Sequence, residues 1–140
     1  MKNPPDARLK ELLVQARTIA VVGLSANEER ASHRVARYLK EQGYRVIPVN
    51  PAVQEVLGEK AYAALEDIPE PVDIVDVFRK SEDVPPIAES AVKIGAKVLW
   101  QQEGVTSEEA ANFAAKAGLE VVMDCCLKLA HQKLLGAMNS

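Results

Sequence analysis

The stretch TIAVVGLSANEERASHRVARYLKEQGYRVIPVNP, residues 18–51, decides the fold of this 140-residue chain. It begins with the apolar run TIAVVGL, continues with the helical periodicity of SHRVARYLKEQG, and ends in a second apolar run, RVIPVN. Continuous apolar runs rich in β-branched residues are typical of strands that are buried on both faces of a sheet. The stretch therefore predicts a strand, a crossover helix and a second, parallel strand.

The same alternation continues to the end of the chain. Three further apolar runs, VDIVDVF, AKVLW and LEVVMD, alternate with the helical stretches 82–95, 107–118 and 126–136. We expect one doubly wound, Rossmann-like α/β domain over residues 1–140, with a parallel sheet of about five strands and helices on both faces. Residues 1–17 are predicted to add a helix that packs on this domain. Residues 52–71 are the least regular, with room for a short extension and one helical turn.

Composition excludes several classes of partner. The chain carries 17 Lys and Arg against 20 Asp and Glu, a net charge of -3, so no global charge attracts nucleic acid or an anionic membrane. No apolar run approaches the roughly 20 residues needed to span a bilayer, and the N-terminus lacks the pattern of a signal peptide. Cys125 and Cys126 are adjacent, where a mutual disulfide is strained. We therefore expect a cytoplasmic protein with free thiols and no membrane association.

The residues that follow each predicted strand are the candidates for a ligand site. In doubly wound sheets, ligands bind beyond the carboxyl ends of the strands. Polar, small or thiol-bearing side chains dominate at these positions, which are Gly23, Leu24, Ser25, Ala26, Asn50, Pro51, Phe78, Arg79, Lys80, Gln101, Gln102, Glu103, Gly104, Asp124, Cys125 and Cys126. Five such loops converge at one edge of the sheet, which favours a binding site there.

The first loop departs from a dinucleotide fingerprint. That fingerprint has three glycines, opens a helix at once, and is followed about 20 residues later by an acidic residue that binds a ribose hydroxyl. Here Gly23 is followed by Ser25 at the second glycine position, the helix is predicted to start near Ser32, and the second strand ends in Asn50 and Pro51 instead of an acid. An NAD(P)-binding oxidoreductase-like domain is the alternative that these features oppose.

The charges around the predicted helix start point to a bound anion. Arg30 precedes the helix, His33 and Arg34 lie in its first turn, and Arg37 lies in its second. Cations are unfavourable there because the first-turn N–H groups already carry partial positive charge, and a phosphate reverses that effect. The alternative is a solvated basic face, offset by neighbouring glutamates.

Taken together, these motifs resemble the coenzyme A-binding domain family. The resemblance rests on Gly23-x-Ser25 with a long turn to Ser32, then VIPVNP, VDVFR and WQQEG, and it spans roughly residues 16–135. The family includes the N-terminal domain of the succinyl-CoA synthetase alpha subunit and small stand-alone proteins. It implies a coenzyme A or acyl-CoA ligand, whose 3'-phosphate also suits a site without a ribose-binding carboxylate.

The resemblance assigns roles to particular residues. It implies that the phosphates of coenzyme A are held by Gly23, Ser25, Arg30, Ser32 and Arg34. It places the adenosine end beside Asn50 and Pro51, and the pantetheine arm along Val77, Phe78 and Arg79. The arm or its thiol end then meets Gln101, Gln102 and Gly104.

Catalysis is not predicted from these residues. In the synthetase, catalysis depends on a histidine of a separate following domain, and neither His33 nor His131 lies in a matching motif. A thiol-dependent enzyme that acts on CoA through Cys125 or Cys126 remains an alternative, because Cys126 stands at the expected start of the last helix and could form a mixed disulfide with CoA. Packing of both cysteines under that helix is the competing interpretation, and the sequence favours a carrier, sensor or regulatory module without chemistry of its own.

Overall fold

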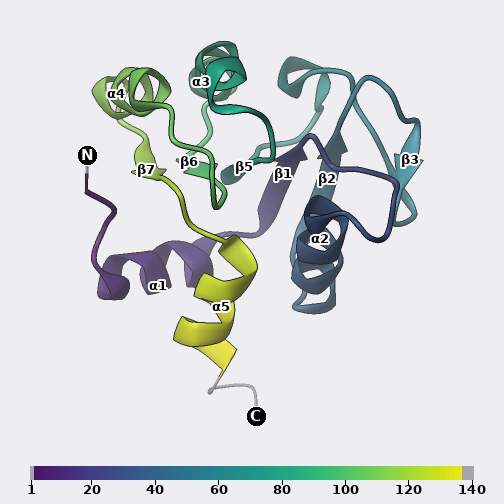
Figure 1. Cartoon of the computed structure of the whole chain (residues 1–140), viewed down its shortest axis with the longest axis horizontal. Coiled ribbons are helices and arrows are strands. Elements are labelled where there is room, and N and C mark those ends of the chain that lie inside the picture. Colours follow the sequence, from purple (N-terminus) through teal and green to yellow (C-terminus); the bar gives the residue numbers. More distant parts are fainter. Residues whose placement is uncertain (1, 137–140) are drawn as a thin grey trace.

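Five parallel strands form the central sheet of the structure, a computed structural model that describes residues 2–136. The spatial order is β2-β1-β5-β6-β7, so the chain starts at β1, adds β2 on one side and the other strands on the opposite side (Figure 1). The strands are β1 (Thr18–Val22), β2 (Arg45–Val49), β5 (Ile74–Val77), β6 (Val98–Gln101) and β7 (Glu120–Val122). The change of direction between β1 and β5 creates the crevice in which such sheets bind ligands.

Helices cover both faces of this sheet, which confirms the predicted Rossmann-like α/β class. Figure 1 shows α3 and α4 on one side of the sheet and α1, α2 and α5 on the other. Their bounds are α1 Asp6–Gln15, α2 Ala31–Glu41, α3 Val84–Lys93, α4 Glu108–Lys116 and α5 Leu127–Leu135. Helix α2 thus begins one residue before the predicted Ser32, and Arg30 is its N-cap residue.

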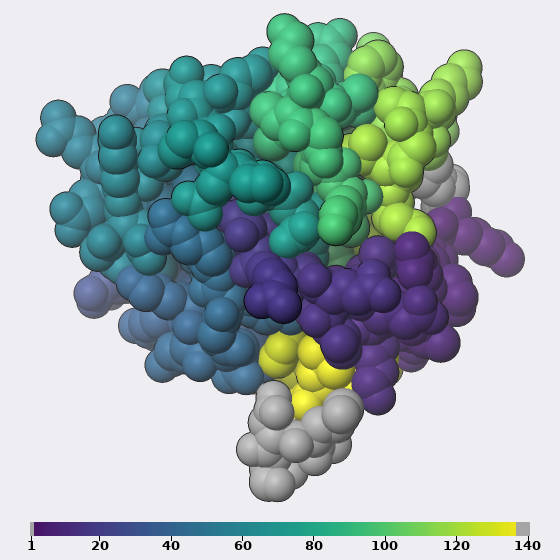
Figure 2. Space-filling model, turned by 180° about the vertical axis from the view of Figure 1, so that it is seen from behind, coloured from purple at the N-terminus to yellow at the C-terminus, as the bar shows by residue number. Residues whose placement is uncertain are grey.

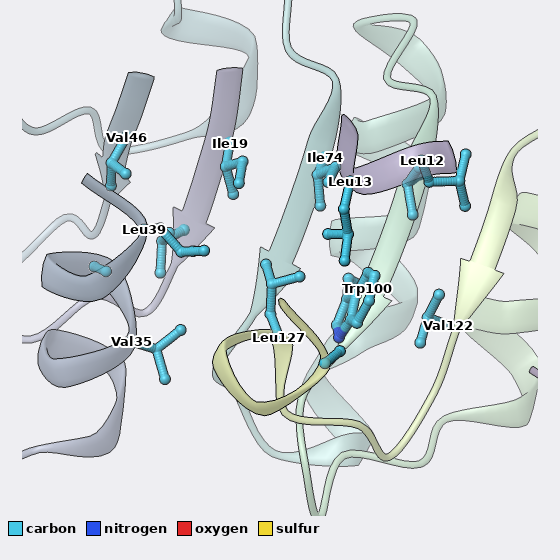
Figure 3. Packing of buried hydrophobic residues seen from close by; sticks show 14 of the residues in the cluster. Leu12, Leu13, Ile19, Val35, Leu39, Val46, Ile74, Trp100, Val122 and Leu127 are labelled. Atoms are coloured by element: carbon cyan, nitrogen blue, oxygen red, sulfur yellow. The ribbon is translucent and has the colours of Figure 1, made fainter. Parts of the chain in front are cut away.

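Each face of the sheet has its own apolar core. Under α1, α2 and α5, the fully buried Trp100 packs among Leu13, Ile74 and Leu127 (Figure 3). Its indole Nε1 donates a hydrogen bond to the carbonyl oxygen of Cys125 at 2.8 Å, which satisfies the one polar atom of the ring. Under α3 and α4, the core consists mainly of alanine and valine side chains.

The N-terminal helix packs against the C-terminal one. Figure 2 shows the purple N-terminal segment beside the yellow α5, and Lys133 Nζ lies 3.1 Å from Asp6 Oδ2. Within residues 2–136, no helix is both long and apolar enough to cross a membrane.

The irregular stretch between β2 and β5 contains more structure than the sequence predicted. It holds a small antiparallel hairpin, β3 (Glu55–Val56) with β4 (Glu59–Lys60), and then the 3-10 turn η1 (Leu65–Asp67). The hairpin turn is Leu57-Gly58, and both residues have positive φ angles. A two-residue hairpin needs this backbone conformation, for which the bulky Leu57 is an unusual residue.

Candidate functional site

Gly23 follows β1 directly and lies against the ends of both neighbouring strands. Its φ angle is +87°, and a Cβ atom built there lies 2.3 Å from the carbonyl oxygen of Phe78. Its N–H donates to the carbonyl of Val49 at 2.8 Å, so the residue is tied to β2 while it touches the end of β5. Only glycine fits here without strain. The turn that it forms lies at the crevice between β1 and β5.

The loop from Gly23 to α2 is held by its own side chains. The hydroxyl of Ser32 accepts a hydrogen bond from the N–H of Ser25 at 3.0 Å, and the hydroxyl of Ser25 accepts one from the N–H of Asn27 at 3.0 Å. The guanidinium of Arg34 donates to the carbonyl of Glu29. These contacts give the loop a defined shape before any ligand arrives.

The start of α2 offers free N–H groups at this loop. The first backbone amides of a helix have no partner within the helix. Those of Ala31 and Ser32 have no acceptor among the described residues, and both residues line the groove described next. Arg30, the N-cap residue, adds a positive charge at the same place.

A groove of about 650 Å³ runs along the carboxyl ends of β1, β5 and β6. Its lining combines cations, two carboxylates, small residues and a few apolar side chains: Gly23, Ser25, Arg30, Ala31, Ser32, Phe78, Arg79, Lys80, Asp83, Gln102, Glu103 and Val105. Arg79 and Asp83 face each other at 4.0 Å, whereas Arg30 and Lys80 have no ion-pair partner within residues 2–136. The groove therefore presents positive charge that the described residues do not neutralise.

Two smaller hollows extend the groove toward η1 and α3. The first, of about 260 Å³, shares Gly23, Arg79 and Asp83 with the groove and is also lined by Pro51, Ala63 and Ile87. The second, of about 180 Å³, shares Ala63 and Ile87 with the first and is mainly apolar. Shared lining residues join the three hollows in a row, with the cations Arg30, Arg79 and Lys80 in the groove and mainly apolar side chains in the last hollow.

The predicted site residues fall into two groups. Those that line the groove or its first extension are Gly23, Ser25, Arg30, Ser32, Pro51, Phe78, Arg79 and Gln102. Those that do not line these hollows are Arg34, Asn50, Val77, Gln101 and Gly104.

Most residues of the second group form hydrogen bonds or pack in the core near the strand ends. Asn50 donates its Nδ2–H to the carbonyl of Leu24 at 3.0 Å, which ties the end of β2 to the first loop. Gln101 is fully buried and exchanges two hydrogen bonds with the backbone of Ser107, at 2.7 and 3.1 Å. Gly104 donates its N–H to Asp124 Oδ1 at 2.7 Å, and Val77 is buried in the core beneath α3 and α4.

Some residues of the site were missed by the sequence analysis. Asp83 and Val105 line the groove but were not predicted, whereas Lys80 and Glu103 were named only as residues that follow a strand, without a role. Below the groove lies the fully buried Asp76, whose Oδ1 accepts a hydrogen bond from Gln102 Nε2 at 2.6 Å. Burial raises the pKa of Asp76 to about 7, and the hydrogen bond from Gln102 opposes the rise only in part. An acid inside the run VDIVDVF was the available signal.

Neither histidine and neither cysteine is among the residues that line the groove or its two extensions. Nδ1 of His33 lies 2.9 Å from the carbonyl oxygen of Ser25, and Nδ1 of His131 lies 2.7 Å from the hydroxyl of Tyr38. Burial lowers the pKa of His131. Cys126 is the N-cap residue of α5, and burial raises the pKa of the Cys125 thiol, which disfavours the thiolate.

Comparison with known proteins decides the family. Residues 17–132 match the family described as CoA binding domain. The chain belongs to the CoA-binding domain family. This CoA-binding domain is 46% identical over 131 residues to the uncharacterized protein YneT of Bacillus subtilis, a match that covers 94% of this chain and 97% of YneT.

Solved structures and larger enzymes share this CoA-binding domain. A hypothetical protein from Pyrococcus horikoshii has a TM-score of 0.94 and 40% identity, over 97% of this chain and 98% of that one. The alpha subunit of acetate–CoA ligase [ADP-forming] II from Pyrococcus furiosus is 33% identical over 129 residues. That match covers 89% of this chain but only 28% of the ligase subunit. The predicted family is thus confirmed, and the ligase contains much sequence that has no counterpart here.

Proposed function

We propose that this chain binds coenzyme A, free or acylated, along the carboxyl edge of its sheet and acts as a carrier, sensor or regulatory module without chemistry of its own. The observation that carries this proposal is the row of three adjoining hollows, cationic in the groove and apolar in the last hollow. Coenzyme A has the matching layout, because its phosphates lie between a flat base and a long, partly apolar arm.

The phosphates fit the start of α2. The free amides of Ala31 and Ser32 and the side chain of Arg30 surround one part of the groove, and Arg79 and Lys80 supply charge from the loop after β5. Amides at a helix start and guanidinium groups are the groups that proteins use to hold phosphate. In this arrangement the pyrophosphate lies beside the Gly23 turn, between the start of α2 and the loop after β5.

The two ends of the ligand follow from this placement. The hollow beside Pro51 leads into the apolar pocket of Ala63, Leu65 and Ile87, which suits the adenine ring. The pantetheine arm then runs the other way, past Phe78 toward Gln102 and Val105. Asn50, which ends β2, offers no carboxylate to a ribose, and this opposes NAD as the ligand.

Isothermal titration calorimetry of the reduced protein tests the proposal. At one ionic strength, CoA, acetyl-CoA, NAD and NADP are titrated in parallel, and we expect saturable binding of one or both CoA compounds and none of NAD or NADP. Binding of NAD or NADP alone overturns the proposal.

A variant with both cysteines replaced by serine tests the thiol alternative. Because neither Cys125 nor Cys126 lines the groove, we expect the Cys125→Ser, Cys126→Ser protein to bind CoA as the parent does. Loss of binding in this variant, with the fold intact, favours a thiol that reacts with the ligand.

A further inference from the structure

Asp76 is a buried acid in a strand that is otherwise apolar. It is fully buried in the middle of β5, level with Val21 of β1 and Trp100 of β6, whose side chains belong to the core under α1, α2 and α5. One carboxyl oxygen accepts the hydrogen bond from Gln102, and the other has no partner among the described residues. Burial of an acid with one unpaired oxygen destabilises the folded protein, so packing alone gives no reason for an acid at this position.

Its partner Gln102 forms part of the groove. The backbone of Gln102 is held on both sides, because its N–H donates to the carbonyl of Val77 at 3.3 Å and its carbonyl accepts from Val105 at 2.8 Å. The side chain is only 3% exposed, yet it lines the groove. The NH2 end of the amide faces Asp76, since Nε2 donates to Oδ1 at 2.6 Å. Above pH 7 the acid is mainly a carboxylate, which accepts hydrogen bonds and cannot donate them, so it selects this orientation. The carbonyl end of the amide, Oε1, is left for the groove.

We propose that Asp76 is a positioning residue, which orients the amide of Gln102 so that its carbonyl accepts a hydrogen bond from a donor on the pantetheine arm. The inference rests on the proposed function, since it adds a specificity element to the same groove. The arm offers two kinds of donor, its amide N–H groups and the thiol of free CoA. A thioester has no hydrogen at sulfur, so a contact with the thiol makes the site prefer free CoA to acyl-CoA.

Two ligands separate positioning from general damage to the site. Adenosine 3',5'-bisphosphate lacks the pantetheine arm and therefore cannot reach Gln102, whereas CoA can. In Asp76→Asn, the amide that replaces the acid both donates and accepts, so it no longer selects one orientation of Gln102. We expect this variant and Gln102→Met to bind CoA about tenfold more weakly, as for one lost hydrogen bond, with unchanged affinity for adenosine 3',5'-bisphosphate.

A double variant provides the rescue. In Asp76→Asn, Gln102→Glu the amide at position 76 donates to the new carboxylate, whose second oxygen again offers an acceptor to the groove. We expect it to recover much of the preference for CoA over adenosine 3',5'-bisphosphate that Asp76→Asn loses. No loss in either single variant, or an equal loss for both ligands in both single variants, overturns the inference.

The parent protein and desulfo-CoA complete the test. If the parent does not bind CoA, the proposed function itself fails. If it binds CoA and the single variants bind CoA equally well, only the role of Asp76 fails. Desulfo-CoA, which lacks the thiol, identifies the donor: a loss seen with CoA but not with desulfo-CoA assigns the thiol, and a loss seen with both assigns an amide N–H of the arm.

Discussion

The ring of His33 holds the carbonyl of Ser25 at 2.9 Å, so a buried side chain in the first turn of α2 fastens the loop that precedes that helix. A carbonyl oxygen can only accept, and Nδ1 of His33 therefore carries the hydrogen. The same loop exposes the amides of Ala31 and Ser32 to the groove. His33 thus acts on the site through the shape of the loop.

Replacing His33 tests this relationship. In His33→Leu the carbonyl of Ser25 loses its donor, and we expect the free energy of unfolding to fall by about 1 to 3 kcal/mol and CoA binding to weaken. His33→Asn is the matched control, because its side-chain NH2 can replace Nδ1–H. Urea denaturation and calorimetry measure the two effects, and equal behaviour of the two variants contradicts the assigned hydrogen bond.

Arg30 and Arg37 distinguish a phosphate site from a generally basic helix. Arg30 lines the groove, whereas Arg37 is exposed on the same helix and is not part of the lining. We expect Arg30→Ala to weaken CoA binding by about 1 to 3 kcal/mol, as for a lost charge-assisted contact, and Arg37→Ala to change it little. Titrations at two salt concentrations measure this difference, and equal losses in the two variants argue for diffuse charge instead.

Arg34 was predicted to contact phosphate, and its guanidinium binds the carbonyl of Glu29. We expect Arg34→Ala to reduce CoA affinity less than Arg30→Ala, through a looser loop. Calorimetry of the two variants under one set of conditions checks the order. A larger loss for Arg34→Ala returns Arg34 to the phosphate contact predicted from sequence.

Gly23→Ala tests the close approach of β1 and β5. The added Cβ meets the carbonyl of Phe78 at 2.3 Å, and the φ angle of +87° is itself unfavourable for alanine. Gly118→Ala is the control, since Gly118 has a φ angle of +95° but no atom within 4 Å of the added carbon. We expect a loss of about 1 kcal/mol for Gly118→Ala and several kcal/mol for Gly23→Ala in urea denaturation. Similar losses show that the strand ends can separate.

The buried acid makes stability depend on pH. Burial raises the pKa of Asp76 from 3.8 to about 7, so between these values the folded protein binds a proton that the unfolded chain has released. The contribution of Asp76 to the free energy of unfolding is therefore complete below pH 3.8 and is lost as pH rises toward 7. At about 1.4 kcal/mol per pH unit, the loss approaches roughly 4 kcal/mol.

Asp76→Asn isolates this contribution. Burial lowers the pKa of His131, so its contribution to the free energy of unfolding is lost as pH falls below the ordinary pKa of histidine. The pH dependence of the parent protein is therefore the sum of two opposite effects. We expect the stability of Asp76→Asn relative to the parent to increase from pH 4 to pH 7 and then to level off. A difference between the two proteins that does not vary with pH shows that Asp76 titrates at its ordinary value.

The order of elements and the sheet edge that carries the groove were predictable from the sequence. Each predicted apolar run became a strand of the sheet. A strand that is apolar on both faces is buried when helices cover both sides of the sheet. Parallel strands then place their following loops at one edge, and this brought Gly23, Phe78 and Gln102 together. The hairpin after β2 was not predicted, since its strands are two residues long and leave no periodic signal.

Only the tertiary structure decided which side chain of each loop faces the groove. Gln101 and Gln102 are identical neighbours, yet one turns to Ser107 at the start of α4 and the other to Asp76 under the groove. Side chains alternate in direction along a strand, so neighbouring residues face different surroundings. The residues that form those surroundings come from distant parts of the chain. The sequence alone therefore determined the sheet and the edge that carries the groove, and the packing of distant elements against that edge determined which groups line it.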